Sequence, residues 1–142
     1  MKVSAKGFTL IELLVVVSII GILATLVTAN LNAARSRSRD AVRKADLKNV
    51  QTALRLYYND KGSYPTSASI IWGAEFSNSS TVYMKALPKD PLPDQTYSYV
   101  PDAANDTFTL SACLENKSDV NCKTVTVPGW TCSSNCVHQV TP

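Results

Sequence analysis

The sequence has few of the residues and motifs that build catalytic centres and metal sites. It contains one histidine, His138, and five glycines, with no glycine-rich phosphate loop and no cysteine pair spaced C-x-x-C. A nucleophile beside a general base, the arrangement that marks many hydrolytic enzymes, is not visible either. The sequence therefore gives no case for an enzyme and predicts no cofactor.

Proline is absent before Pro65, and residues 8–29 carry no charge except Glu12. This apolar run has the length of a helix that spans a bilayer, about 20 residues. A carboxylate within it costs roughly 2.5–3.5 kcal/mol on insertion, so Glu12 is expected to have a partner. Two other interpretations stay open. Glu12 lies near the start of the run and could reach the membrane interface. The run could also be a secretory signal peptide, although the apolar part of such peptides usually spans about 7–15 residues.

The segment after the apolar run has the pattern of an amphipathic helix. Its apolar residues recur mostly three or four positions apart, with charges between them: Ala34, Ala41, Ala45, Leu47, Val50, Leu54 and Tyr57. Because no proline interrupts it, the pattern predicts one helix from Phe8 to Tyr58, about 75 Å long at 1.5 Å per residue. The helix is expected to stop at residues 59–62, with Gly62 in the left-handed position after its last turn. A helix of that length does not fit inside so small a domain, so its first half must be buried in something else.

The remaining sequence predicts a small domain. Residues 62–95 are expected to form an irregular connector with a short helix near Ser80–Leu87. Three strand-like runs follow, Tyr97–Val100, Thr107–Leu114 and Cys122–Val127, and the tail from Pro128 is expected to be a loop. An antiparallel sheet of these strands packed on the helix gives an α+β fold. Aliphatic residues are few here, so the core is expected to draw on aromatic ones: Tyr64, Trp72, Tyr83, Tyr97, Phe108 and Trp130.

The four cysteines, Cys113, Cys122, Cys132 and Cys136, lie within the last thirty residues. An even number behind a membrane-targeting segment indicates two disulfides in an exported domain. Of the three connectivities, the two local pairs Cys113–Cys122 and Cys132–Cys136 are favoured. A zinc site of the four thiolates, or of three with His138, is the alternative, although the spacing matches no common zinc finger.

Charge is unevenly distributed along the chain. Residues 35–55 hold seven cations against Asp40 and Asp46: Arg35, Arg37, Arg39, Arg43, Lys44, Lys48 and Arg55. From residue 59 onward there are five basic and eight acidic residues. Within the helix, Asp40 can pair with Arg43 or Lys44, and Arg43 with Asp46. The basic face at residues 35–48 is therefore predicted to be solvated or to contact other subunits, with the phosphates of DNA as a less favoured partner.

Several stretches together resemble the type IV pilin and pseudopilin family, which carries class III signal peptides. The stretches that carry the resemblance are Gly7-Phe8-Thr9-Leu10-Ile11-Glu12-Leu13, Asp46-Leu47, Ala53-Leu54, Tyr57-Tyr58, Gly62-Ser63-Tyr64-Pro65, Leu87-Pro88-Lys89-Asp90-Pro91 and Tyr97-Ser98-Tyr99. The resemblance implies a pilin fold, with a long N-terminal helix on a small antiparallel sheet. It divides the chain into a leader (1–7), a membrane or filament-core helix (8–29), an amphipathic helix half (30–61) and a globular head (62–142).

The resemblance also implies how such a chain is processed and assembled. A prepilin peptidase would cleave between Gly7 and Phe8 and methylate the new amine of Phe8. The subunit would sit in the inner membrane with its head outside the cytoplasm. It would then leave the bilayer through an inner-membrane assembly platform for an extracellular pilus or a periplasmic pseudopilus. In the filament, Glu12 would pair with the Phe8 amine of a neighbouring subunit, an arrangement that propagates as an open helix.

Alternative functions accompany this resemblance, and the sequence departs from the family pattern at one position. The filament could be a pseudopilus of a type II secretion or competence system, or the chain could be a single-pass membrane-anchored binding module that does not polymerise. Asp90, Asp94, Asp102 and Asp106 also resemble the calcium loop of major pseudopilins, although the glycine-rich stretch of that loop is missing. The departure is Ala29, which stands where many relatives have proline. We therefore expect the stem to stay more helical in a filament than theirs.

Overall fold

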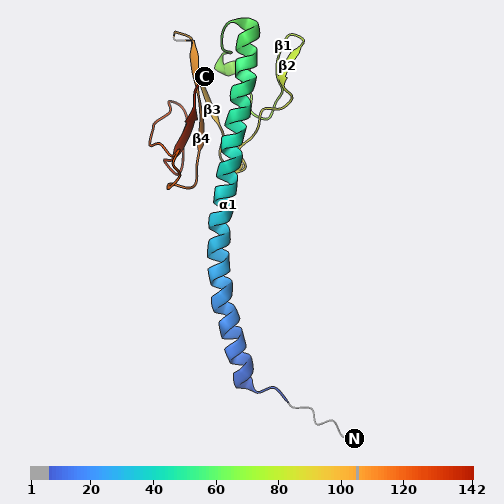
Figure 1. Ribbon diagram of the computed structural model, residues 1–142, viewed down its shortest axis with the longest axis vertical. Coiled ribbons are helices and arrows are strands. Elements are labelled where there is room, and N and C mark those ends of the chain that lie inside the picture. Colours follow the sequence, from blue (N-terminus) through green and yellow to red (C-terminus); the bar gives the residue numbers. More distant parts are fainter. Residues whose placement is uncertain (1–6, 105) are drawn as a thin grey trace. The chain divides into compact units, whose positions relative to one another are not determined.

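The computed structural model describes residues 7–104 and 106–142, so the predicted leader lies outside the described residues except for Gly7. The chain divides into two compact units, residues 1–35 and residues 36–142. One element, helix α1 (Leu10–Lys61), contributes its first half to one unit and its second half to the other (Figure 1). Its backbone is helical through Ala29. Each unit is described below by itself.

In the N-terminal unit, the apolar side chains of α1 are exposed. Leu10, Leu14 and Val16 are 81%, 58% and 46% accessible. This part of α1 is long and apolar enough to cross a membrane, judged by length and composition alone. The apolar surface therefore has to be covered by something outside this unit.

The end of α1 follows the sequence prediction. Gly62 adopts φ +74°, and its N–H donates to the Tyr58 carbonyl at 2.7 Å. A residue with this φ is strained unless it is glycine, so Gly62 closes the helix and redirects the chain.

The second unit contains a three-stranded antiparallel sheet in the order β3–β4–β5. Its strands are β3 (Ser98–Asp102), β4 (Thr107–Cys113) and β5 (Val137–Val140). The prediction of the third strand at Cys122–Val127 was wrong. That stretch makes only isolated bridges, and the strand lies in the tail that was expected to be a loop. The reason is burial: Val137 is 1% exposed beside Cys113 of β4, whereas Val125 is 40% exposed.

A second sheet pairs β1 (Phe76–Asn78) with β2 (Thr81–Met84), and a 3-10 turn, η1 (Ser67–Ser69), precedes it. The short helix predicted near Ser80–Leu87 was wrong. Ser79 turns the chain with φ +57°, which makes a tight hairpin. The β-branched and aromatic residues that follow it favour a strand.

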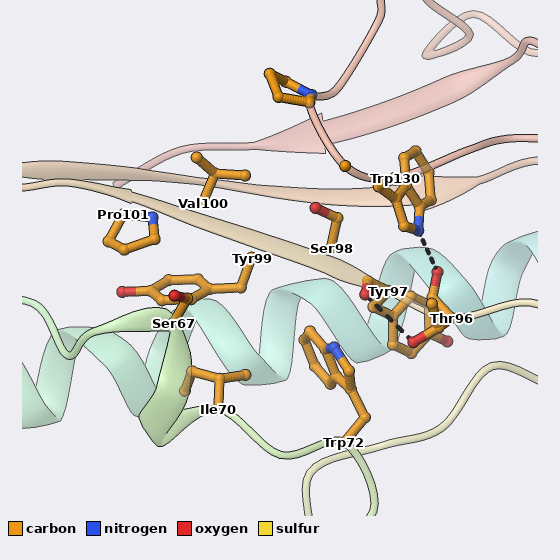
Figure 2. Close-up of a pocket in the computed structure, with 12 residues that line it drawn as sticks. Ser67, Ile70, Trp72, Thr96, Tyr97, Ser98, Tyr99, Val100, Pro101 and Trp130 are labelled. Atoms are coloured by element: carbon orange, nitrogen blue, oxygen red, sulfur yellow. Dashed lines mark hydrogen bonds between the residues drawn. The ribbon is translucent and has the colours of Figure 1, made fainter.

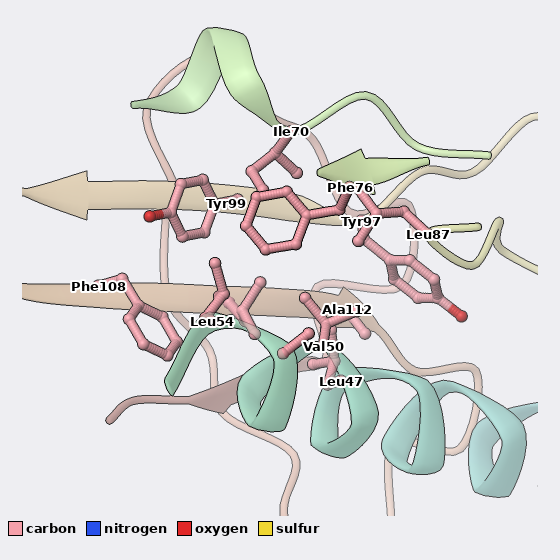
Figure 3. Packing of buried hydrophobic residues seen from close by; sticks show 12 residues of the cluster. Leu47, Val50, Leu54, Ile70, Phe76, Leu87, Tyr97, Tyr99, Phe108 and Ala112 are labelled. Atoms are coloured by element: carbon pink, nitrogen blue, oxygen red, sulfur yellow. The ribbon is translucent and has the colours of Figure 1, made fainter. Parts of the chain in front are cut away.

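The core lies between the second half of α1 and the inner face of the larger sheet (Figure 3). Leu47, Val50 and Leu54 point from the helix toward the sheet and are fully buried. The other members of the cluster are Ala53, Ile70, Phe76, Leu87, Tyr97, Tyr99, Phe108, Leu110 and Ala112. The apolar stripe was predicted too long toward the N-terminus, because Ala34, Ala41 and Ala45 are exposed.

Aromatic residues contribute much of this core, as the sequence predicts. Tyr97 and Phe108 are fully buried, and Tyr64, Trp72 and Tyr83 pack against the cluster. Trp130 was assigned to the core wrongly, since it lines a groove at the sheet edge.

Both disulfides form, but the predicted pairing was wrong. Cys113 is bonded to Cys132 and Cys122 to Cys136, with Cα–Cα distances of 5.2 and 4.9 Å. β5 brings the tail back beside β4, so cysteines distant in sequence become neighbours while the local pairs do not. All four cysteines are bonded in these two pairs, so none of them is a free thiol.

Candidate functional site

Gly7 and Phe8 form an exposed junction at the start of the described chain. A Cβ added at Gly7 would meet no atom within 4 Å, so nothing in the fold requires glycine there. Phe8 is 79% exposed. The site predicted to be cut is therefore open to an enzyme, and a requirement for glycine has to come from that enzyme's approach to the backbone.

Glu12 caps the first turn of α1 together with Thr9. The Thr9 N–H and hydroxyl both donate to Oε2 of Glu12, at 2.9 and 2.6 Å, and the Glu12 N–H donates to the Thr9 hydroxyl at 3.3 Å. This reciprocal pattern is a capping box, which satisfies helix N–H groups that have no carbonyl partner. Sequence reasoning missed this role, although Thr9-x-x-Glu12 is its signature. The other oxygen, Oε1, is not part of the cap.

Arg43 is the centre of a buried ionic cluster that joins α1 to two distant segments of the head. Its guanidinium is 0% exposed and makes a two-pronged contact with Asp90, both bonds 2.8 Å long. Nη1 also donates to Asp40 and to Glu115, each at 2.8 Å. A planar guanidinium with five N–H donors can serve three carboxylates at once, which a lysine cannot.

The same carboxylates also accept main-chain N–H groups. Asp40 accepts from the N–H groups of Glu115 and Asn116, both at 2.9 Å, and Asp90 accepts from Leu92 at 2.9 Å. Burial by itself lowers the pKa of Arg43, but bonds to Asp90, Glu115 and Asp40 more than offset it and raise that pKa above its ordinary value. Arg43 therefore stays charged, and the bonds that Asp40 accepts from the N–H groups of Glu115 and Asn116 fix where the chain leaves β4.

Two further cations of the basic segment contact the head. Arg39 pairs with Glu115 through two bonds of 2.7 and 2.6 Å, and Lys44 with Asp119 at 2.5 Å. The bond to Arg39 is the main reason that the pKa of Glu115 falls to about 2, and the contact with Lys44 lowers the pKa of Asp119. With Arg43, three of the six cations at residues 35–48 are thus paired with carboxylates of the same chain.

Of the ion pairs predicted within the helix, Asp40–Arg43 forms. Lys44 is bonded to Asp119 instead, and Asp46 accepts the Tyr97 hydroxyl at 2.7 Å. Burial raises the pKa of Tyr97, and the Asp46 carboxylate raises it further, so Tyr97 remains a donor. Tertiary partners therefore replace neighbours on the helix.

Three of the four aspartates considered for calcium have other partners. Asp90 is bonded to Arg43, Asp106 accepts the Tyr58 hydroxyl at 2.5 Å, and Asp102 accepts the Ala104 N–H at 3.1 Å. Within residues 7–104 and 106–142, no three histidine, cysteine or acidic side chains gather as a metal site. The structure thus does not bring these four aspartates together.

Comparison with known proteins identifies the family. The prokaryotic N-terminal methylation motif matches residues 3–28, and the model of type II secretion system protein G matches residues 30–119, more than half of the chain. This chain belongs to the type IV pilin and type II secretion protein G family. No solved structure matches it.

Its relatives in that family include both pilus and secretion components. The type IV wide pilus major component PilA4 of Thermus thermophilus is 38% identical, over 72% of this chain and 69% of the relative. The type IV major pilin PilA of Myxococcus xanthus is 33% identical, over 75% of this chain and 52% of the relative. The type II secretion system core protein G of Pseudomonas aeruginosa is 32% identical, over 74% and 80%. An α+β pilin fold agrees with this membership.

Proposed function

We propose that this chain is a structural subunit of a type IV pilus-like filament. A prepilin peptidase cuts between Gly7 and Phe8 and methylates the Phe8 amine, and an inner-membrane platform moves the subunit from the bilayer into a helical filament. The observation that carries the proposal is the exposed apolar half of α1, which begins directly after the Gly7–Phe8 junction. A bilayer can cover this surface first, and the same surface of other subunits can cover it later.

Glu12 would have a role in both the bilayer and the filament. Its capping box uses Oε2, so Oε1 can accept the Phe8 amine of a neighbouring subunit while the helix stays capped. In a dry filament core, each of these charges compensates the other. Methylation leaves the positive charge of the amine in place.

Glu12→Gln tests this role more sharply than Glu12→Ala. Glutamine also serves in a capping box, so the variant keeps the helix start and loses the charge. We expect it to insert into the membrane and to be processed at Phe8, but to form few or no filaments by electron microscopy. Thr9→Ala is the matched control, because it weakens the cap and keeps the carboxylate.

The experiment also distinguishes a filament subunit from a membrane-anchored binding module that does not polymerise. A membrane-anchored binding module would not depend on the charge. Normal filament numbers with Glu12→Gln would overturn the pairing with Phe8, and a membrane-inserted wild-type chain that is never found in filaments would overturn the whole proposal. Mass spectrometry of filaments, showing a chain that begins with methylated Phe8, tests the processing step.

A pseudopilus of a type II secretion system is the second candidate, favoured by the match of residues 30–119 to protein G. Deletion of the gene separates the two assignments. Loss of surface filaments with intact secretion supports a pilus, whereas loss of secretion with unchanged surface filaments supports a pseudopilus.

A further inference from the structure

A groove runs along the free edge of β3 on the head. It has a volume of about 620 Å³, within the range of 300–1,000 Å³ typical of small-molecule sites. Both tryptophans of the chain, Trp72 and Trp130, line it (Figure 2). Tyr97, Tyr99 and Val100 from the β3 region also line it, together with Pro128 and Gly129 of a neighbouring turn. The filament proposal makes no use of this groove.

The aromatic side chains of the groove are held in place before any ligand arrives. The indole N–H of Trp130 donates to the Thr96 carbonyl at 2.9 Å, and the ring of Trp72 meets Tyr97 edge-on with centroids 5.4 Å apart. The phenols of Tyr97 and Tyr99 are bonded to Asp46 and to the Pro65 carbonyl, both at 2.7 Å. Such preorganisation lowers the entropy that binding would otherwise cost.

Gly129 explains how Trp130 reaches this position. It adopts φ +71° after Pro128, and the Trp130 N–H donates to the Val127 carbonyl at 3.2 Å. Proline followed by a glycine of positive φ is the signature of a type II turn. The turn presents the indole at the sheet edge, away from the core to which the sequence assigned it.

The chemistry of the lining narrows the ligand. Among the described residues that line the groove, none is acidic, basic or a histidine, and the polar side chains other than the tyrosines are hydroxyls: Ser67, Thr96 and Ser98. Phosphates and charged peptides therefore find no countercharge here. Flat apolar rings beside hydroxyl groups suit a ligand that has an apolar face and a polar rim.

An added peptide strand fits the edge less well. Pro101 has no N–H to offer a further strand, and proline on an edge strand blocks such pairing. At the start of the edge, the carbonyls of Thr96 and Tyr97 already accept bonds from Trp130 and from the Thr96 hydroxyl. Main-chain carbonyls at the start of this edge are thus already hydrogen-bonded, whereas the faces of the aromatic rings in the groove remain available to a ligand.

We propose that this groove binds an uncharged saccharide chain, with pyranose rings stacked on Trp72 and Trp130 and ring hydroxyls bonded to Ser67, Thr96 or Ser98. The two indoles, one on each wall, would hold successive sugar units. The site would give the filament a lateral contact with neutral polysaccharide, a function additional to assembly.

The experiment uses the full-length protein in micelles of a detergent without a sugar head group, titrated with cellohexaose and with maltohexaose. Because both tryptophans line the groove, their fluorescence reports it directly. We expect a saturable change with at least one of the two hexasaccharides. Calorimetry should show the affinity falling at least tenfold in Trp72→Ala and in Trp130→Ala, and less than threefold in Trp72→Phe. Val82→Ala on β2, an exposed residue outside the groove, should bind as the wild type does.

Three outcomes would overturn the proposal. The first is no saturable response to either saccharide at millimolar concentration in protein whose circular dichroism is native. The second is binding of a neutral octapeptide of valine and threonine without binding of saccharide, which would assign the edge to strand addition. The third is a fluorescence change that depends on protein concentration alone, which would assign the groove to a second copy. Glu12→Gln should keep saccharide affinity, so failure of the filament proposal would be distinguishable.

Discussion

The two halves of α1 distribute apolar and charged side chains in opposite ways. In the N-terminal half, apolar residues such as Leu10 and Leu14 are exposed. In the second half, Asp40 and Arg43 are buried at 2% and 0% exposure, beside the buried Leu47. The second half is completed within its own chain, whereas the first half needs a bilayer or other subunits.

The two prominent charges of the helix differ in the same way. Arg43 bonds three carboxylates of its own unit, so it is an element of stability. Among the described residues, the side chain of Glu12 has one hydrogen-bond partner, Thr9. The comparison predicts that mutations in the second half change the free energy of unfolding, and that mutations in the first half change assembly.

Arg43→Ala should have the largest effect on stability. It leaves the buried carboxylates of Asp40 and Asp90 without their cation, a change that costs about 3–5 kcal/mol. Urea unfolding of the full-length protein in micelles, followed by circular dichroism, measures it. Arg37→Ala, at an exposed position of the same helix, is the control and should change the free energy of unfolding by less than about 0.5 kcal/mol. Equal effects of the two variants would contradict the assignment of the cluster.

Two leucines on the same helix allow a matched test of the packing difference. Leu54 is fully buried and Leu14 is 58% exposed. Leu54→Ala should destabilise the head by about 2–5 kcal/mol, since it leaves a cavity among the residues of Figure 3. Leu14→Ala should leave head unfolding in micelles unchanged. A comparable loss in Leu14→Ala would mean that the apolar half is part of the head's folding unit.

The sequence allowed prediction of the features that depend on nearby residues. Gly62 ends α1 as expected, and two of the three predicted strands match β3 and β4 closely. The resemblance carried by Gly7, Phe8 and Glu12 led to the family that the comparisons confirm. In each case the signal lies within a few residues: a left-handed glycine, an alternation of apolar and polar residues, or a motif.

Features that depend on the return of the C-terminal tail were missed. β5 pairs with β4, and this pairing places Cys136 near Cys122 and Cys132 near Cys113. Nothing local in the sequence records that register. The Arg43 cluster was missed for the same reason, because its partners Asp90 and Glu115 are 47 and 72 residues away. The helix alone offered Asp46, which bonds Tyr97 instead.

The ionic cluster around Arg43 is expected to make the stability of the head depend on pH. The pKa of Glu115 falls to about 2 from a usual value near 4.5, chiefly through its bond to Arg39. A depressed carboxyl pKa stabilises the fold above the unfolded pKa, and this stabilisation is lost as pH falls from about 5 toward 2. Glu115 is 27% exposed, so solvent screening reduces the effect to the order of 1 kcal/mol.

Thermal unfolding of the wild type and of Glu115→Gln at a series of pH values measures this contribution. The difference between the two proteins should be largest near neutral pH and should shrink below about pH 4. A constant difference across that range would show that the charge of Glu115 is not what stabilises the fold. Asp94→Asn, which removes a carboxylate at an exposed position outside the cluster, is the control variant.

The smallest effect is expected at the start of α1, where Thr9 and Glu12 form the capping box. Thr9→Ala removes a hydroxyl that both donates to Glu12 and accepts its N–H, and loss of such a cap costs about 1 kcal/mol. Because this half of the helix is completed from outside, the loss should stay local. Amide exchange of the Glu12 N–H in micelles should quicken about fivefold while head unfolding is unchanged, and Thr9→Ser should restore the wild-type rate. If Thr9→Ala lowered the stability of the head instead, the two halves of α1 would be energetically coupled. The contrast between a half that is completed within the chain and a half that is completed from outside would then be wrong.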